Sequence, residues 1–489
     1  MAHFKQNYRS PTGLILLLCL FFIHSSQTNF LTPTELIEDL DQFQQELEER
    51  FAYLKVHDVD YKSTIQAIRE QAENGMSLEE FGLELRKVIG LFIDCHAGIS
   101  GIGYPEGYLP FQIEPVGERY VAFSPDRTEF VDPLYPFITK IDTQSIDDWC
   151  KSLEVIVPKG SPQHIKYRTL RIIEFIQYAR LVTGQAQSNS VIVELESEDG
   201  KMNISLPLIV ADQAPPIEPW PYSQSRVLKE NIGYLRIKGW NEDAFNEAAI
   251  WMPRFPAARG LIVDIRGNRG GTRNVLRDLY PYFVEDSDTP HVAGASKYRL
   301  YSEFKSDHLY SRKIFPLNWE GWTFAERLAI TEFMQTFEPE WKVPDQEFSV
   351  WHFWVLSKRS KPDAYYFNKP IVFLMDDKCF SASDVILSSV RGMPNITLIG
   401  TPSRGGSGAY VATTLKNSGL NLRLSSMASF QNTGILFDSR GVEPDIFIAS
   451  EPEFFLKNGA DKALELAVQT ILDRSEMGGK AGKIRRDTQ

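Results

Sequence analysis

The sequence predicts an α/β protein in which a covered, largely parallel sheet follows two smaller modules. Four short segments in the C-terminal half are apolar at consecutive positions, as strands buried on both faces are. Two amphipathic helical patterns lie near the N-terminus. The proline-rich stretch "DQAPPIEPWPYSQ", residues 212–224, marks a boundary in front of the sheet. Together these observations indicate a mixed α/β chain with several modules.

Length and charge exclude some classes of protein. A chain of 489 residues exceeds one ordinary domain, and at about 150 residues per domain it predicts about three. The formal net charge of −12 argues against a nucleic-acid binder and against adhesion to an anionic membrane surface. We therefore expect no nucleic-acid partner. The only basic bias is the tail "GGKAGKIRR".

Residues 1–27 have the pattern of a signal peptide. Lys5 and Arg9 precede the apolar run "GLILLLCLFFI", which is too short for a membrane span, and we place cleavage near Ser26. We expect an exported protein, periplasmic or extracellular, without stable membrane insertion. The cysteines beyond this segment allow at most one disulfide; they are Cys95, Cys150 and Cys379.

A helical module is predicted over residues 28–100. The motif "TPTE" from Thr32 is a capping box with proline at the first helical position, and "SLEE" from Ser77 begins a second helix. Small residues in "IDCHAGIS" then end the helical period and place His96 in a turn. The apolar residues at helical spacing are Leu36, Leu40, Phe43, Leu47, Phe51 and Leu54 in the first pattern, and Leu78, Phe81, Leu85, Val88 and Phe92 in the second.

Three further segments complete the predicted organisation. Residues 101–215 mix alternating segments such as "RYVAF" and "VIVELES" with the helical run "YRTLRIIEFIQYARL", which indicates a mixed α/β module. Residues 216–450 form the sheet-bearing core, and 451–489 a C-terminal helix with the basic tail. The predicted core strands are residues 233–237, 260–265, 370–375 and 396–400.

The core contains an aromatic-rich insertion at residues 285–367. Each tryptophan taken singly indicates a packed subdomain, although as a group they could wall a groove. These tryptophans are Trp319, Trp322, Trp341, Trp351 and Trp354.

The segment "KPIVFLMDDKCFSASDVILSSV", residues 369–390, contains a serine where a strand passes into a helix. Ser381 followed by Asp384 has the form of a capping box. A serine at this place also lies beside unpaired amides and the positive end of the helix dipole, where an oxyanion can be held. This motif alone leaves both interpretations open. The loop "RGNRGG" after residues 260–265 allows close approach to the main chain, but it lacks the pattern of a phosphate-binding loop.

Four ordered blocks are more specific: "GLIVDIRGNRGG", "PIVFLMDDKCFSASD", "ITLIGTPSRGGSG" and "GILFDSRGVEPDI". Over residues 230–448 they resemble the catalytic core of the C-terminal processing peptidase (tail-specific protease) family of serine peptidases. The resemblance implies a crotonase-like (ClpP/crotonase) α/β core that cleaves polypeptides. It assigns the nucleophile to Ser381, with Cys379 and Ser383 as local competitors. The implied oxyanion donors are the amide of Ala382 and one amide of Gly270 or Gly271.

The residue expected as general base differs from the lysine of the better-known Ser-Lys branch of that family. Gly406 stands at the lysine position, whereas "FIDCHAGI" resembles the Asp-x-His segment of the tricorn-like and chlamydial-protease-like branch. This resemblance implies that His96 is the general base, a role that suits an imidazole with an ordinary pKa of about 6.5. It implies Asp438 as the acid that orients the imidazole, with Glu443 as the alternative.

The stretch from "LPFQIEP" through "PFITKIDTQSIDDW" resembles the PDZ-like domain inserted in this family, which would present a groove to an extended peptide. A structural spacer is the alternative. The sequence thus predicts an exported serine endopeptidase with a Ser-His-acid triad, a polypeptide substrate and no metal or organic cofactor. A non-catalytic binder of apolar ligands or peptides on the same fold and an esterase are the alternatives. The oligomeric state, a homo-oligomer included, stays open.

Overall fold

The computed structural model describes residues 30–210, 220–301, 303–304 and 307–486. The predicted signal peptide and most of the proline-rich boundary lie outside these residues, so both stay predictions. Within the described part of the chain, no helix is both long enough and apolar enough to cross a membrane.

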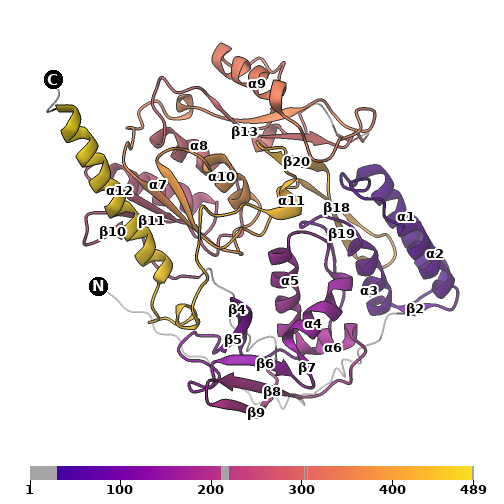
Figure 1. The fold of residues 1–489 in the computed structure, drawn as a ribbon. Coiled ribbons are helices and arrows are strands. Elements are labelled where there is room, and N and C mark those ends of the chain that lie inside the picture. Colours follow the sequence, from indigo (N-terminus) through magenta and orange to yellow (C-terminus); the bar gives the residue numbers. More distant parts are fainter. Residues whose placement is uncertain (1–29, 211–219, 302, 305–306, 487–489) are drawn as a thin grey trace, which may run out of the picture.

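The N-terminal helical module has three helices, one more than predicted (Figure 1). Helix α1 (Pro33–Arg50) and helix α3 (Leu78–Ile89) both begin at the capping boxes read from the sequence. Helix α2 (Tyr61–Ala72) was not predicted, and only three of its residues are buried, so its apolar face is narrow. Phe51 ends α1 in an extended conformation, so the buried Phe51 and Leu54 lie beyond the helix. Strands β1 (Phe30–Leu31) and β2 (Met76–Ser77) pair beside these helices.

The middle module is an antiparallel sheet covered by helices. The strand order is β4-β5-β6-β8-β9, and β7 pairs with β6. Its core combines alternate strand residues with the apolar faces of the helices. The strands are β4 (Gln112–Val116), β5 (Arg119–Phe123), β6 (Phe137–Ile141), β7 (Gln144–Ser145), β8 (Ser190–Ser197) and β9 (Gly200–Pro207), and the helices are α4 (Ile146–Leu153), α5 (Pro162–Glu174) and α6 (Ile176–Val182).

The core of the molecule is a six-stranded sheet of order β10-β11-β12-β16-β17-β21. All neighbouring strands run parallel except β10 and β11. The four predicted core strands and their parallel arrangement are therefore confirmed. The strands are β10 (Arg226–Val227), β11 (Gly233–Arg236), β12 (Leu261–Asp264), β16 (Ile371–Met375), β17 (Ile396–Gly400) and β21 (Ile446–Phe447).

Helices cover both faces of this sheet, which explains why its strands are apolar at consecutive positions. Leu261 and Val263 of β12 pack into the cluster that contains the buried faces of α7 (Glu242–Trp251), α8 (Asn274–Leu279) and α10 (Ala382–Val390). Ile262, between them, packs on the opposite face with residues of α12 (Lys462–Arg486). Figure 1 shows α12 lying across the sheet on the side away from α8 and α10.

The aromatic-rich segment contributes to a second sheet, of order β14-β15-β13-β20. Trp322 and Trp354 are buried in two different clusters of apolar residues. Trp319, Trp341 and Trp351 are half-buried and pack against the cluster that contains Trp322. The elements are β13 (His291–Tyr298), β14 (Phe315–Pro316), α9 (Phe324–Thr336), β15 (His352–Leu356) and β20 (Met427–Gln431). A third sheet joins β18 (Tyr410–Thr414) and β19 (Asn421–Ser425) to β3 (Gly98–Ser100) of the N-terminal part.

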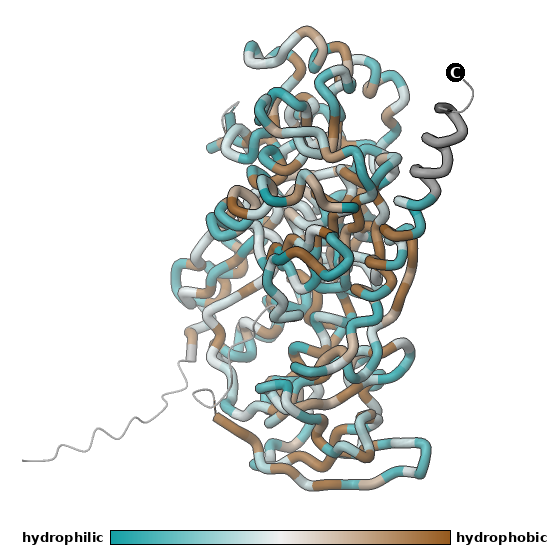
Figure 2. Tube along the Cα trace, turned by 90° about the vertical axis from the view of Figure 1, so that its left-hand side faces the viewer, coloured by the Kyte–Doolittle hydropathy of each residue, from teal (hydrophilic) through white to brown (hydrophobic). Residues whose placement is uncertain are grey.

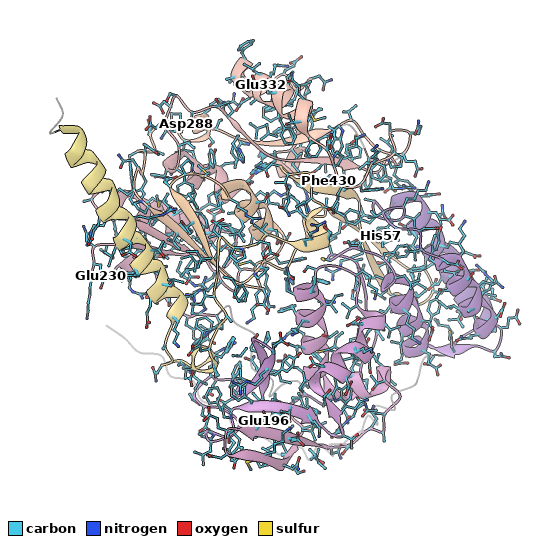
Figure 3. All side chains as sticks on the ribbon, in the orientation of Figure 1. His57, Glu196, Glu230, Asp288, Glu332 and Phe430 are labelled. Atoms are coloured by element: carbon cyan, nitrogen blue, oxygen red, sulfur yellow. The ribbon has the colours of Figure 1, made fainter. Side chains whose placement is uncertain are left out.

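The molecule is elongated. In Figure 3, Glu332 of α9 and Glu196 of β8 lie at opposite ends, and the buried Phe430 of β20 lies between them. Figure 2 shows apolar stretches running through the interior and hydrophilic residues along the outer loops. The core sheet and the turn after α3 meet in the middle of this long body, and the predicted site residues lie there.

Candidate active site

Ser381 lies at the sharp turn between β16 and α10. Its backbone has φ 60° and ψ −111°, a strained conformation for a residue with a side chain. Its side chain makes no capping hydrogen bond. The carboxylate of Asp384 instead accepts hydrogen bonds from the Ser403 hydroxyl at 2.6 Å and from the Gly405 amide at 2.9 Å. The capping-box interpretation is therefore wrong, and the Ser381 hydroxyl is free to face another group.

That other group is His96. The two atoms Ser381 Oγ and His96 Nε2 are 3.1 Å apart, although 285 positions separate the residues in the chain. His96 lies in the predicted turn after α3, where its amide donates to Asp94 Oδ1 at 2.9 Å. Its ring stacks on Phe380, with centroids 4.5 Å apart, and only 11% of its side chain is exposed. The backbone contact with Asp94 and the Phe380 ring thus hold the imidazole beside Ser381.

Asp438, on the short helix α11 (Phe437–Arg440), is the buried acid next to this pair. Its Oδ1 is 4.0 Å from His96 Nδ1, beyond a direct hydrogen bond, and Nδ1 has no hydrogen-bond partner among the described residues. The Asp438 carboxylate accepts from the Cys95 amide at 3.0 Å and from the Tyr53 hydroxyl at 2.9 Å. Glu443, the alternative acid, is exposed.

Asp94 is a site residue that the sequence analysis did not single out. It is buried, and it accepts from the His96 amide and from both the amide and the hydroxyl of Ser425. Burial and the neighbouring Asp438 charge raise the pKa of Asp94 to about 6. The Asp-x-His spacing was the available signal, because an aspartate often accepts from the amide two residues on.

Asp94, His96 and Asp438 form the one group of described residues with enough ligand atoms for a metal ion, all within 4.8 Å of one another. However, each of the four carboxylate oxygens already accepts a hydrogen bond from the protein. His96 Nε2 faces Ser381. The donor set therefore suits proton transfer better than metal coordination.

The glycine loop after β12 lies against Ser381. Gly270 has φ 101°, and a Cβ added to it would come within 2.8 Å of Ser381 Cβ. The amide of Gly270 donates to the side chain of Asn268 at 2.9 Å. The amides of Gly271 and Ala382 make no hydrogen bond within the described part of the chain. These two amides are thus the donors that remain free for an oxyanion.

The side chains of the two alternative nucleophiles, Ser383 and Cys379, have other contacts. Ser383 Oγ donates to the Asn268 carbonyl at 2.9 Å and accepts from Trp240 Nε1 at 2.8 Å. Cys379 is buried with its thiol 3.2 Å from the Ile265 carbonyl, and burial raises the pKa of this thiol. The three described cysteines, Cys95, Cys150 and Cys379, are free thiols.

No room exists for a lysine base at Gly406. A Cβ added there would lie 2.5 Å from the Phe380 ring and 3.2 Å from Cys95 Cβ. The ring that stacks on His96 therefore fills the space that a Ser-Lys site would need.

A cleft of about 500 Å³ opens beside His96 and Ser381. Gly271, Gly408 and Tyr410 are among its lining residues, together with three arginines and no acid. The cleft therefore places solvent-accessible space directly at Ser381.

Solved structures that share this fold include three of CPAF. Mature CPAF complexed with lactacystin has 16% sequence identity and a TM-score of 0.63, with coverage of 89% of this chain and 98% of that one. Mature CPAF alone has 16% identity and a TM-score of 0.61 over 88% and 96%. A CPAF mutant has 15% identity and a TM-score of 0.65 over 90% and 98%. No curated protein sequence matches the chain.

The sequence also matches a family model. Residues 231–448 match that of peptidase family S41, and this range holds Ser381, Asp438 and the glycine loop. This core therefore matches the C-terminal processing peptidase family that the four sequence blocks resemble, and the match supports a serine-type peptidase.

Proposed function

We propose that the protein is an exported serine endopeptidase that cleaves flexible polypeptides through an acyl-enzyme. The observation that carries the proposal is the 3.1 Å separation of Ser381 Oγ and His96 Nε2 at the wall of an open cleft. A nucleophile and a base within hydrogen-bond reach are the minimum for acyl transfer. The match to a peptidase family supplies the class of bond.

The proposed reaction begins when His96 Nε2 takes the hydroxyl proton as Ser381 Oγ attacks the scissile carbonyl. The amides of Ala382 and Gly271 stabilise the tetrahedral oxyanion. The imidazolium of His96 then gives its proton to the leaving amine, and the new N-terminus departs. Water attacks the acyl-enzyme with His96 again as base, which releases the acid product and restores Ser381.

Asp438 is proposed to stabilise the imidazolium. At 4.0 Å its carboxylate lies close to the His96 ring without a direct hydrogen bond to it. The amide of Cys95 and the hydroxyl of Tyr53 fix the position of this carboxylate. Catalytic hydrogen bonds are often long before substrate binds, so the gap is compatible with a triad that tightens in the complex.

The finer fold assignment belongs to the same proposal. The parallel sheet with Ser381 at the start of α10 supports a crotonase-like core. The five-stranded path of the middle module supports a PDZ-like domain that positions an extended peptide.

The non-catalytic binder is less well supported. That alternative predicts that His96 fails to reach Ser381, whereas the two atoms lie at hydrogen-bond distance. An esterase would use the same triad, and its mark is a preference for small esters over unfolded protein.

The test is cleavage of casein by the wild type, by Ser381→Ala and by His96→Ala. Both variants should lose activity by about a thousandfold or more while keeping the wild-type circular dichroism spectrum. His57→Ala is the control for histidine removal, because His57 is exposed (Figure 3).

Cys379→Ala tests the alternative nucleophile Cys379. A fluorophosphonate should label wild type at Ser381 and spare the Ser381→Ala variant. Casein cleavage that survives in Ser381→Ala would refute the proposal.

A further inference from the structure

Three arginines line the cleft beside Ser381. Arg269 and Arg273 flank the glycine loop after β12, and Arg312 ends the short 3₁₀ turn Tyr310–Arg312. The lining contains no aspartate or glutamate. Among the described residues, none of these three guanidinium groups forms an ion pair, although the chain as a whole has 64 acidic and 52 basic residues. The cleft is thus cationic on an acidic protein.

Arg273 is the most unusual of the three, because only 7% of it is exposed. Its side-chain hydrogen bonds both run from Nη2 to Ser407, to the carbonyl at 3.1 Å and to the hydroxyl at 2.6 Å. Both acceptors are neutral. Burial and the nearby Arg312 charge lower the pKa of Arg273 to about 9. A buried guanidinium normally has an anionic partner, and here the described residues supply none.

Arg312 and Arg269 extend the positive charge outward. Arg312 is half-buried, its side chain makes no hydrogen bond within the described chain, and burial lowers its pKa. Arg269 is exposed and lies over the Tyr167 ring of α5, 5.8 Å from the ring centroid. The cationic groups therefore come from the glycine loop and from the segment that follows β13.

We propose that this cleft selects polypeptides that carry an aspartate or glutamate side chain next to the scissile bond. The inference rests on the proposed function and adds its substrate class. The carboxylate would accept charge-assisted hydrogen bonds from Arg312 and would supply the anion that Arg273 lacks. Because the site is partly enclosed, salt screens such a contact less than it screens a surface pair.

The rest of the lining agrees with an acidic side chain. Thr272, Asn274 and Ser311 are polar, and the Phe380 ring is already covered by His96 and by Arg404, which lies 4.1 Å from its centroid. A large aliphatic side chain would find few apolar partners there. We therefore expect charge, and not apolar contact, to determine which substrate side chain the cleft prefers.

The first experiment uses quenched fluorescent peptides in pairs that differ only by Glu or Gln at each residue flanking the scissile bond. The wild type should show a kcat/KM ratio of about tenfold or more in favour of Glu at one of these positions, as expected for a charge-assisted hydrogen bond. Arg312→Gln should reduce the ratio toward one. Arg312→Glu should turn the preference toward a peptide with Lys at that position. Arg254→Gln, which changes an exposed arginine outside the cleft, should keep the wild-type ratio.

The second experiment does not require turnover. Fluorescence anisotropy measures the binding of the same peptide pairs to Ser381→Ala and to Ser381→Ala/Arg312→Gln. The single variant should bind the Glu peptide about tenfold more tightly than the Gln peptide, and the double variant should lose this difference. Equal binding of both peptides by Ser381→Ala would overturn the inference. Cleavage of casein with no Glu preference in the peptides would overturn the inference and leave the proposed function intact. Selective binding of the Glu peptide without any cleavage by the wild type would support the inference and refute the proposed function.

Discussion

A serine in front of a helix has two chemical uses, and at Ser381 the neighbouring residues decide between them. The Ser-x-x-Asp pattern favours a capping box, but φ 60° turns the hydroxyl away from the helix amides and toward His96. Asp384 takes a different role, because its carboxylate holds Ser403 and Gly405 in the loop that carries Gly406. The Ser-x-x-Asp pattern therefore marks the start of a helix, but its two side chains bind residues from elsewhere in the fold and do not cap the helix.

Asp438 and Glu443 give a residue-scale prediction about the triad. Asp438→Asn should lower kcat by about a hundredfold or more, because the imidazolium loses its buried counter-charge. Glu443→Gln should leave kcat within about twofold, because Glu443 is exposed. Casein cleavage at neutral pH measures both effects, with circular dichroism as the folding control. Equal losses in the two variants would contradict the assignment.

Asp384 gives a prediction about pH. Burial raises the pKa of its carboxyl from about 3.8 to about 7. Between these two pH values the folded state keeps a proton that the unfolded state releases, so this group makes stability fall as pH rises, by up to about 1.4 kcal/mol per pH unit. Below pH 3.8 both states hold the proton and the contribution is flat.

Asp384→Asn should remove this slope. The amide nitrogen can take the place of Oδ2, which has no hydrogen-bond partner among the described residues, while the oxygen keeps Ser403 and Gly405. Urea unfolding of the wild type and the variant between pH 4 and pH 7, about the window set by these pKa values, measures the difference. A constant difference across the window would show that Asp384 is already ionised at the low end.

At the scale of elements, the site is assembled from the ends of three of them. The turn after α3 supplies His96, the turn after β16 supplies Ser381, and the loop after β12 supplies the glycines. The N-terminal module is fixed to the core by the pairing of β3 with β19 and by the Tyr53 hydroxyl on Asp438. The helices before residue 96 therefore position His96 relative to Ser381.

The close approach of two of these turns predicts the effect of Gly270→Ala. The added methyl would meet the Phe380 carbonyl at 2.7 Å and Ser381 Cβ at 2.8 Å, at a φ of 101°. We expect a loss of about 2–4 kcal/mol in unfolding free energy and loss of casein cleavage. Gly184→Ala is the matched control, because Gly184 also has positive φ but open space around it. It should cost about 1 kcal/mol and keep activity. Similar losses in both variants would mean that backbone strain, and not contact with Ser381, dominates.

At the scale of the whole molecule, polar contacts fix the middle module to the loop before Gly406 and to α11. Ser161 Oγ donates to the Arg404 carbonyl, and Gln163 Nε2 donates to the carbonyls of Ser403 and Arg440. A nearly buried ion pair joins Lys378, three residues after the end of β16, to Glu114 of β4, with 2.8 Å between Nζ and Oε1. The module thus touches the same loop that Asp384 holds.

This ion pair predicts coupling between the module and the core. Glu114→Gln removes the carboxylate that pairs with the Lys378 ammonium and, at 3.6 Å, with Arg171, and should cost about 3 kcal/mol in urea unfolding. The double variant Glu114→Gln/Lys378→Met removes both charges and should recover at least half of that loss. Additive losses in the double variant would show that the two residues act independently.

The sequence by itself determined the parts of this protein that depend on local patterns. Consecutive apolar positions gave the parallel strands, two capping boxes gave the starts of α1 and α3, and the ordered blocks gave the peptidase family. Helix α2 was missed because its apolar face is narrow. The hydrogen bond from the Gly270 amide to the Asn268 side chain was not predicted, because it depends on a backbone turn that no sequence pattern shows.

Only the tertiary structure decided which side chains meet. The 3.1 Å contact between His96 and Ser381, the 4.0 Å gap to Asp438 and the unpaired arginines of the cleft involve residues up to hundreds of positions apart. Hydrogen bonds and charge interactions depend on distances of a few ångströms, and packing of the helical module, the parallel sheet and the middle module sets those distances.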